Sequence, residues 1–303
     1  MTLHAALLVL FSALLHPVRD LILKGHPYPE SAYLAVTAAW VAIAFAHTVA
    51  AGTPLTLPAG TWQLVVASAA CLTAYYFGTM AALKTGDLSI YYPIIRSSPL
   101  LIVVLSWMAG RAQYAQPVLA GIVLVVLAGF MLQRQPGRLV ASPRTALLAV
   151  IAMAGSAGYT IADHAAMAGA PANLATGAVG HAAVLSPQAF LFWVYVLVTP
   201  AFAALTLLFK PKERNARTHL TAGWGASPGR LVAASGISYL SYLLILSAFG
   251  IGAGAAETAA VRQASIPVSV VLAALVLGET RLLPRLGWAS LIAAGIAMIL
   301  LGG

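Results

Sequence analysis

The stretch Tyr91-Tyr92-Pro93-Ile94-Ile95-Arg96-Ser97-Ser98 places an arginine inside an apolar run, and Ala259-Ala260-Val261-Arg262-Gln263-Ala264 does the same near the other end of the chain. Arg262 follows Arg96 by 166 positions, and sliding the sequence along itself by that offset produces further matches. These matches are Tyr76 with Tyr242, Ala82 with Ala248, Gly86 with Gly252, Gly121 with Gly287 and Gly129 with Gly295. The chain is therefore interpreted as a tandem duplication. Because the matching segments are apolar and about twenty residues long, the repeated unit is predicted to be a set of membrane helices.

Composition supports a membrane protein. Of the 303 residues, 61% are apolar and only 8% are charged, and the mean hydropathy is +0.92. A soluble core of this length cannot bury so much apolar surface. The formal net charge of +9 does not indicate nucleic-acid binding, because the basic residues lie in short loops at helix ends, where they set topology. The single cysteine, Cys71, excludes an internal disulfide and a cysteine metal site.

Ten segments are long and apolar enough to cross a bilayer about 30 Å thick. They run over residues 3–24, 31–51, 61–83, 88–109, 117–133, 145–167, 187–209, 230–249, 254–277 and 284–302. The fold class predicted is all-α membrane, with ten transmembrane helices. Residues 1–139 form the first five-helix repeat and residues 140–303 the second.

Loop charges predict the topology. Lysines and arginines follow the first, third, fifth, seventh and ninth spans, including Lys24, Lys84, Arg134 and the cluster within 210–230, whereas the opposite side offers essentially only Arg111. The positive-inside rule then places both termini outside the cytoplasm. An odd number of spans per repeat also inverts one half relative to the other, with a pseudo-two-fold axis in the membrane plane. That architecture is typical of alternating-access transporters.

Several motifs resemble the EamA-type members of the drug/metabolite transporter superfamily, and the resemblance extends over essentially the whole chain. They are Leu14-Leu15-His16-Pro17-Val18-Arg19-Asp20, Gly86-Asp87-Leu88-Ser89, Tyr92-Pro93 with Arg96-Ser97-Ser98-Pro99, Tyr159-Thr160-Ile161-Ala162-Asp163, and Ala260-Val261-Arg262-Gln263 through Leu277-Gly278-Glu279. Pro17 and Asp20 stand where the family usually has alanine and asparagine.

The resemblance implies an exporter of amino acids or related metabolites. It also implies a central cavity lined by helices one, three, four, six, eight and nine. Members of the family are usually described with cytoplasmic termini, the reverse of what the loop charges indicate, so the absolute orientation stays open. Aromatic amino-acid exporters of the family have tryptophans near the positions of His16, Tyr92 and Ser156, which leaves the substrate open as well.

Asp20, Arg96, Asp163 and Arg262 lie inside the predicted spans, where an isolated charge is costly. The inverted symmetry predicts two acid–base pairs, Asp20 with Arg96 and Asp163 with Arg262, one on each side of the midplane. Such pairs can fasten helices permanently, or act as gates that form in one state only. Alternatively, an arginine can bind a substrate carboxylate or phosphonate through its planar guanidinium group.

Candidate substrate-binding residues combine apolar faces with one polar group each. They are His16, Tyr76, Tyr92, Tyr159 and Tyr242, together with Arg96 and Arg262. Pro17, Pro93, Pro99 and Pro267 fall inside predicted spans and are expected to kink them. Glu257, near the start of the ninth span, is a candidate for a coupling proton, although a solvated carboxylate at a helix start is the simpler interpretation.

Other classes of function fit poorly. The sequence has no phosphate-binding Gly-x4-Gly-Lys motif and no His-Glu-x-x-His metal motif. A hydrolase built from Ser156 and His164 lacks the strained elbow, and a channel lacks a ring of charges or a carbonyl filter. The leading hypothesis is therefore a monomeric secondary active transporter of the plasma membrane. It would move a small organic solute, with a proton as a possible coupling ion and with no cofactor, metal or nucleic acid. The alternatives are a sensor or scaffold with the same fold, and an importer of an anionic organic solute.

Overall fold

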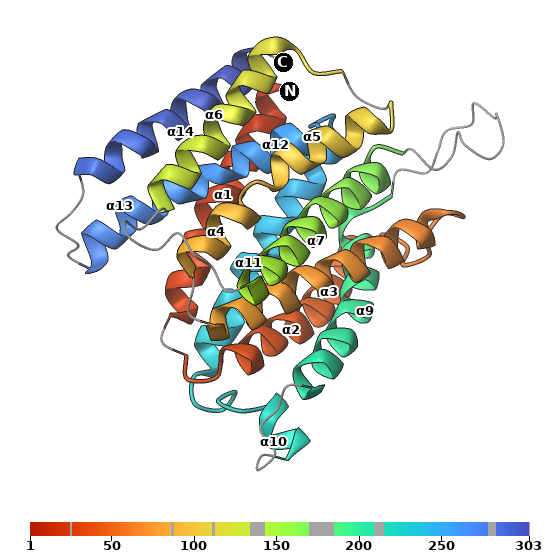
Figure 1. The fold of residues 1–303 in the computed structure, drawn as a ribbon. Helices are drawn as coiled ribbons and strands as arrows, with labels where there is room; N and C mark the ends of the chain where they lie inside the picture. The colour runs from red at the N-terminus through yellow and green to blue at the C-terminus, as the bar shows by residue number, and fades with distance from the viewer. Residues whose placement is uncertain are drawn as a thin grey trace.

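The computed structural model describes residues 1–24, 26–85, 88–110, 113–133, 143–169, 185–208, 215–277 and 283–302, and all regular structure in these ranges is helical (Figure 1). The elements are α1 (Leu3–Leu23), α2 (Pro29–Ala50), α3 (Thr61–Thr85), α4 (Leu88–Ile95), α5 (Ser98–Met108), α6 (Gln116–Gln133), α7 (Pro143–Met167), α9 (Pro187–Leu208), α10 (Ala216–Leu220), α11 (Pro228–Gly250), α12 (Ala255–Val261), η1 (Arg262–Ala264), α13 (Ser265–Leu277) and α14 (Leu283–Gly302). The predicted repeat boundary at 139/140, the motif Gly86-Asp87 and the basic residues 210–214 lie outside the described residues.

Seven helical segments in the described ranges are long and apolar enough to cross a membrane. They are Leu3–Leu23, Pro29–Ala50, Thr61–Ala82, Tyr91–Met108, Pro143–Met167, Pro187–Leu208 and Pro228–Gly250. Each coincides with a span predicted from the sequence, and eight of the predicted spans, the fifth and tenth included, correspond to single helices whose ends differ from the prediction by at most two residues. The chain is therefore an all-α, multi-pass membrane protein.

Two of the matching helices, α6 and α14, contain apolar segments that are shorter than the seven above in the described ranges, Gln116–Leu132 and Leu286–Gly302. The other two predicted spans are divided. The ninth, predicted as one helix over 254–277, is divided into α12, η1 and α13. The fourth, predicted over 88–109, is likewise interrupted between α4 and α5, although its Tyr91–Met108 part still counts as a span.

The helices pack in pairs that join the first half of the chain to the second. The closest pairs are α1 with α11, α3 with α7, α2 with α9 and α6 with α14. The N- and C-termini lie at the same end of the bundle (Figure 1). The core is rich in aromatic side chains, and Trp40 of α2 stacks at 4.2 Å from the ring of Tyr195 of α9 and 5.7 Å from that of Tyr242 of α11. Neither half of the chain therefore encloses its own core.

Glycines set the closest helix contacts. A Cβ atom on Gly121 of α6 would lie 2.6 Å from the carbonyl oxygen of Gly295 in α14, and a Cβ on Gly295 would lie 2.8 Å from the carbonyl oxygen of Gly121. Because Gly302 meets Pro117 further along, the two helices run antiparallel. Gly121 and Gly295 thus allow the close approach of α6 and α14, whereas Gly287 has open space around it.

The connection between α9 and α11, expected to be a loop, contains the short helix α10. Ser31 at the start of α2 donates to the Leu220 carbonyl at 2.8 Å, and the Trp224 indole donates to the Ser31 carbonyl at 2.9 Å. Arg230 at the start of α11 donates to the carbonyls of Ile22 and Lys24. The Arg230 contacts satisfy carbonyls at the end of α1 and hold that end against α11, whereas the Ser31 contacts hold the start of α2 against the connection.

Candidate functional site

Two membrane helices are irregular at Arg96 and Arg262. In the fourth span, Arg96 and Ser97 separate α4 from α5, and Pro99 lies in the first turn of α5. Proline has no N–H and disfavours a helical residue before it, so the helix must restart there. The Ser97 hydroxyl donates to the Pro93 carbonyl at 3.0 Å and so satisfies part of the broken backbone.

The ninth span departs from α-helical geometry at the related position, where a 3-10 turn joins α12 to α13. Arg262 begins the 3-10 turn η1, and α13 starts at Ser265 with Pro267 as its third residue. Pro17 and Pro93 lie inside α1 and α4. Pro99 stands in the first turn of α5 and Pro267 in the first turn of α13, directly after the irregular segments at Arg96 and Arg262, and the bends predicted at the four prolines stay predictions.

The two breaks meet each other through Gln263. The Arg96 guanidinium donates to the Gln263 side-chain oxygen at 3.0 Å, and the Gln263 amide donates to the Arg96 carbonyl at 3.4 Å. The neighbouring helices α5 and α12 also pack together. Arg96 and Arg262 therefore lie in the same region, with the Gln263 side chain between them.

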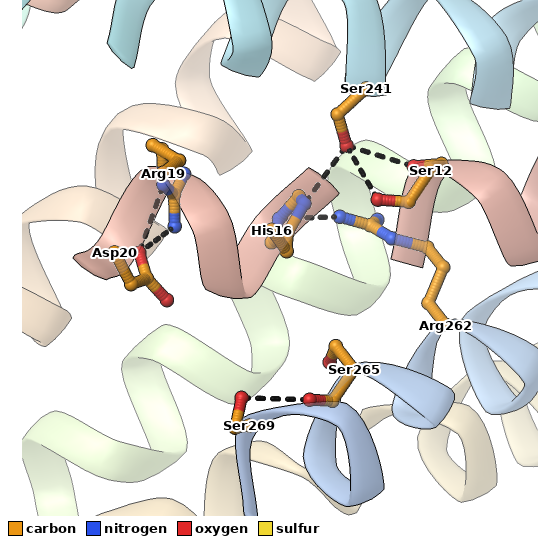
Figure 2. A network of polar contacts seen from close by, with 8 residues as sticks. All are labelled: Ser12, His16, Arg19, Asp20, Ser241, Arg262, Ser265 and Ser269. Carbon is orange, nitrogen blue, oxygen red and sulfur yellow. Dashed lines mark hydrogen bonds and ion pairs between the residues drawn. The ribbon is translucent and has the colours of Figure 1, made fainter. Parts of the chain in front are cut away.

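One face of α1 supplies a polar row that faces this crossing. Ser12, His16 and Asp20 recur at four-residue spacing, which puts them on one side of the helix. Figure 2 shows the His16 ring between Ser241 of α11 and Arg262. The His16 Nδ1 atom lies 2.9 Å from the Ser241 hydroxyl, and its Nε2 atom lies 3.4 Å from the Arg262 guanidinium.

Hydrogen bonding around Ser241 assigns the protonation of His16. Ser241 donates to the Ser12 carbonyl at 3.1 Å and also lies 2.9 Å from the Ser12 hydroxyl. Its oxygen is then left to accept from the Ser12 hydroxyl and from His16 Nδ1–H. Arginine is only a donor, so His16 Nε2 must accept from Arg262. His16 is thus a neutral imidazole that orients the guanidinium of Arg262.

These residues line a cavity of about 710 Å³, a size in the range of small-molecule binding sites. Its lining residues come from α1, α2, α3, α4, α5, α7, α12, η1 and α13 and are Ala13, His16, Arg19, Asp20, Leu23, Lys24, His26, Pro29, Tyr33, Tyr75, Thr79, Tyr91, Tyr92, Ile95, Arg96, Ser98, Ser156, Tyr159, Thr160, Ala259, Arg262, Gln263 and Ser265. The resemblance implied a contribution from the eighth span. Among the described lining residues α2 contributes instead, and α11 stands behind the lining.

The cavity extends to one side of the membrane helices. Lys24, His26 and Pro29 line it where α1 connects to α2. On α7 the lining reaches Tyr159 and Thr160, one turn before Asp163. The Asp163 carboxylate is 1% exposed, accepts from the Ser68 hydroxyl at 2.5 Å and also accepts from the Tyr242 hydroxyl. A buried cluster of Ser68, Asp163 and Tyr242 therefore lies beyond the inner end of the cavity.

The two carboxylates of the predicted ion pairs have other partners in this conformation. Asp20 forms a salt bridge with Arg19 at 2.7 Å instead of with Arg96, because the two side chains are neighbours on the exposed end of α1. Asp163 accepts from hydroxyl groups instead of pairing with Arg262. Between the described side chains, neither predicted pair is formed.

Five of the seven predicted substrate-binding residues line the cavity: His16, Tyr92, Arg96, Tyr159 and Arg262. The other two lie behind it. Tyr76 shares a hydroxyl contact of 2.9 Å with Tyr195, and Tyr242 belongs to the Asp163 cluster. Glu257, the candidate proton carrier, lies in the first turn of α12 and outside the lining residues.

Sequence reasoning missed Arg19, Gln263 and Tyr33. Arg19 follows His16 by three residues, the spacing of one helical turn, so the pattern that selected His16 could have found it. Gln263 gave no such signal, because its role depends on the break in the ninth span. Tyr33 lies on α2, a helix that the resemblance did not place at the cavity.

Comparisons with known proteins define the fold but no family. No known family and no curated protein matches the sequence. Twenty-seven chains of solved structures match the structure. One of them, described only as "Crystal structure of protein", is 18% identical, with a TM-score of 0.71 over 98% of this chain and 96% of its own. The protein thus shares a known fold over its whole length.

Proposed function

We propose that the protein is a secondary transporter of the plasma membrane with ten spans in two inverted halves. It moves a small polar or amphipathic organic solute by alternating access through the cavity described above. The resemblance to EamA-type transporters and the direction of export belong to this proposal. The observation that carries it is the pair of helix breaks at Arg96 and Arg262, which stand at equivalent positions of the repeat and meet at the cavity. Interrupted helices at corresponding positions of two halves are characteristic of transporter binding sites.

Helix packing supports the inverted repeat. Exchanging the halves converts the pair α1–α11 into α7–α3, and both pairs are among the closest in the fold. Individual residues follow the same exchange. Ser12 of α1 contacts Ser241 of α11. The equivalent positions in the exchanged pair are Gly155 of α7 and Tyr75 of α3, and a Cβ on Gly155 would lie 2.7 Å from the Tyr75 backbone nitrogen.

The one-sided cavity supports alternating access. It is lined along the second half of α1 up to the connection with α2, while the Asp163 cluster lies beyond its other end. A cavity whose described lining reaches one side of the helices is the geometry expected of one state in such a cycle. By the positive-inside rule, the side next to Lys24 is cytoplasmic, so this state is inward-facing.

The repeat also indicates which contact closes this side of the cavity in the outward-facing state. Asp163 occupies the position in α7 that Asp20 occupies in α1, and Tyr242 of α11 is equivalent to Tyr76 of α3. Exchange of the halves converts the buried contact between Asp163 and Tyr242 into one between Asp20 and Tyr76. In the outward-facing state, Asp20 leaves Arg19 and accepts from the Tyr76 hydroxyl.

Transport is tested with purified protein in liposomes loaded with a mixed pool of small carboxylic acids, amides and amino acids. Transport predicts that a labelled member of the pool exchanges saturably across the membrane, and that Arg262→Gln abolishes the exchange. Arg217→Gln, an exposed arginine on α10, is the matched control and should leave exchange unchanged. Binding of solutes without exchange of any of them would refute transport and favour a sensor or scaffold.

A further inference from the structure

The charge of the cavity indicates the class of solute. Four cationic side chains, Arg19, Lys24, Arg96 and Arg262, line it in the described part of the chain, against the single carboxylate of Asp20. Asp20 is already paired with Arg19 and lies near the mouth, 58% exposed. The inner part of the cavity therefore holds two arginines without an acidic partner among its described lining residues.

Arg96 and Arg262 keep donors for a ligand. A guanidinium carries five N–H groups, and Arg96 gives one hydrogen bond to Gln263 among the described residues. Arg262 contacts His16 at 3.4 Å and lies within hydrogen-bonding reach of Tyr159. These partners are neutral, so they orient the guanidinium groups without neutralising them. Cationic groups at this depth in a membrane protein need an anion, because an unpaired charge is costly there.

The rest of the wall is aromatic. Tyr33, Tyr75, Tyr92 and Tyr159 line the cavity, and the rings of Tyr75 and Tyr159 lie 5.8 Å apart in an edge-to-face arrangement. Tyrosine rings offer apolar faces that bury an aromatic or aliphatic body. The volume of about 710 Å³ accommodates such a body together with its charged group.

We infer that the solute is an organic anion with an aromatic or apolar body, whose oxyanion group is bound between Arg96 and Arg262. The inference rests on the proposed transport function and makes its substrate class specific. It departs from the amino-acid substrates that the family resemblance implies. An amino acid carries an ammonium group beside its carboxylate, and this group has no free acidic partner among the described lining residues. Planar guanidinium groups bind carboxylate and phosphate alike, so the shared chemistry is the oxyanion.

The test compares ligands that differ in charge but share one skeleton. Thermal stabilisation of the full-length protein in nanodiscs is titrated with 3-phenylpropionate, its neutral amide 3-phenylpropanamide, the zwitterion phenylalanine and 2-phenylethyl phosphate. We expect the acid or the phosphate ester to bind at least about tenfold more tightly than the amide and phenylalanine. Whichever of the two anions binds more tightly identifies the oxyanion. Equal binding of the amide or of phenylalanine, or no binding of either anion, overturns the inference.

The arginine variants locate the bound group. Loss of hydrogen bonds to a charged ligand weakens binding on the order of 10- to 100-fold, so Arg96→Gln and Arg262→Gln should each lose that factor for the anions and change little for the amide. Arg217→Gln should match the wild type. Anion binding that survives both cavity variants overturns the assignment, and the ligand series on the wild-type protein stays decisive if a variant fails to fold.

The outcomes for binding and for transport are separable. Anion-specific binding without exchange in liposomes leaves the site intact and refutes transport. Exchange of phenylalanine with no preference for the acid leaves transport intact and refutes the anionic substrate.

Discussion

Replacing Gly155 with alanine is expected to weaken the contact between α7 and α3 that carries one wall of the cavity. The new Cβ would lie 2.6 Å from the Cys71 carbonyl oxygen and 2.7 Å from the Tyr75 nitrogen. Ordinary contact begins at 3.4 Å, so the helices must separate by about 0.8 Å, because both opposing atoms are backbone. Overpacking of this kind costs about 1–3 kcal/mol.

Alanine also removes the conformational freedom of a glycine in a helix, which stabilises by about 0.5–1 kcal/mol. The net expectation for Gly155→Ala is a loss of about 1–2 kcal/mol. Gly236→Ala on α11 is the matched control, because its Cβ meets no atom within 4 Å. Only the favourable effect of alanine, at most about 1 kcal/mol, remains there.

Unfolding in mixed micelles, titrated with sodium dodecyl sulfate and followed by tryptophan fluorescence, measures both variants. Since Ser156 and Tyr159 of α7 line the cavity together with Tyr75 of α3, Gly155→Ala should also weaken ligand binding. If Gly155→Ala were as stable as Gly236→Ala, the close approach of α7 to α3 would be wrong.

Asp163→Ala should destabilise by about 2–5 kcal/mol in the same unfolding assay, because it leaves the buried hydroxyls of Ser68 and Tyr242 without their acceptor; a loss below 1 kcal/mol would contradict the cluster. In a Cys71→Ala background, Thr56→Cys should react with a membrane-impermeant maleimide on intact cells. Thr218→Cys should react only after permeabilisation, because the positive-inside rule predicts that the basic loops are cytoplasmic; the opposite pattern would reverse the orientation.

Much of the fold was predictable from the sequence because hydropathy and length decide membrane helices almost independently of tertiary contacts. Eight predicted spans match single helices within two residues at each end. The breaks in the fourth and ninth spans were not predicted as breaks. Every residue on either side of Arg96 is apolar or small, so a hydropathy pattern continues through the interruption. The prolines that restart the helices were instead interpreted as kinks.

The candidate site was predictable where a residue is unusual for its surroundings. Arg96, Arg262 and His16 are polar groups in apolar spans, and all three line the cavity. The hydrogen-bond and ion-pair partners of these residues were harder to predict, because they depend on which helices are in contact. The offset of 166 residues relates spans three and four to eight and nine, but His16 corresponds to Tyr159 at an offset of 143. Longer connections before and after α9 shift the register, and this shift hid the relation between α1 and α7.

Accessibility of a single cavity position from both sides of the membrane tests the central claim most directly. Ser156 lines the cavity on α7, and Ser156→Cys in the Cys71→Ala background keeps its size and places one thiol there. The protein is reconstituted in liposomes, and an impermeant maleimide is added to the outside or enclosed inside. Alternating access predicts labelling from either side, with a solute that favours one state shifting the two rates in opposite directions. Labelling confined to the side of Lys24 under all conditions would contradict it.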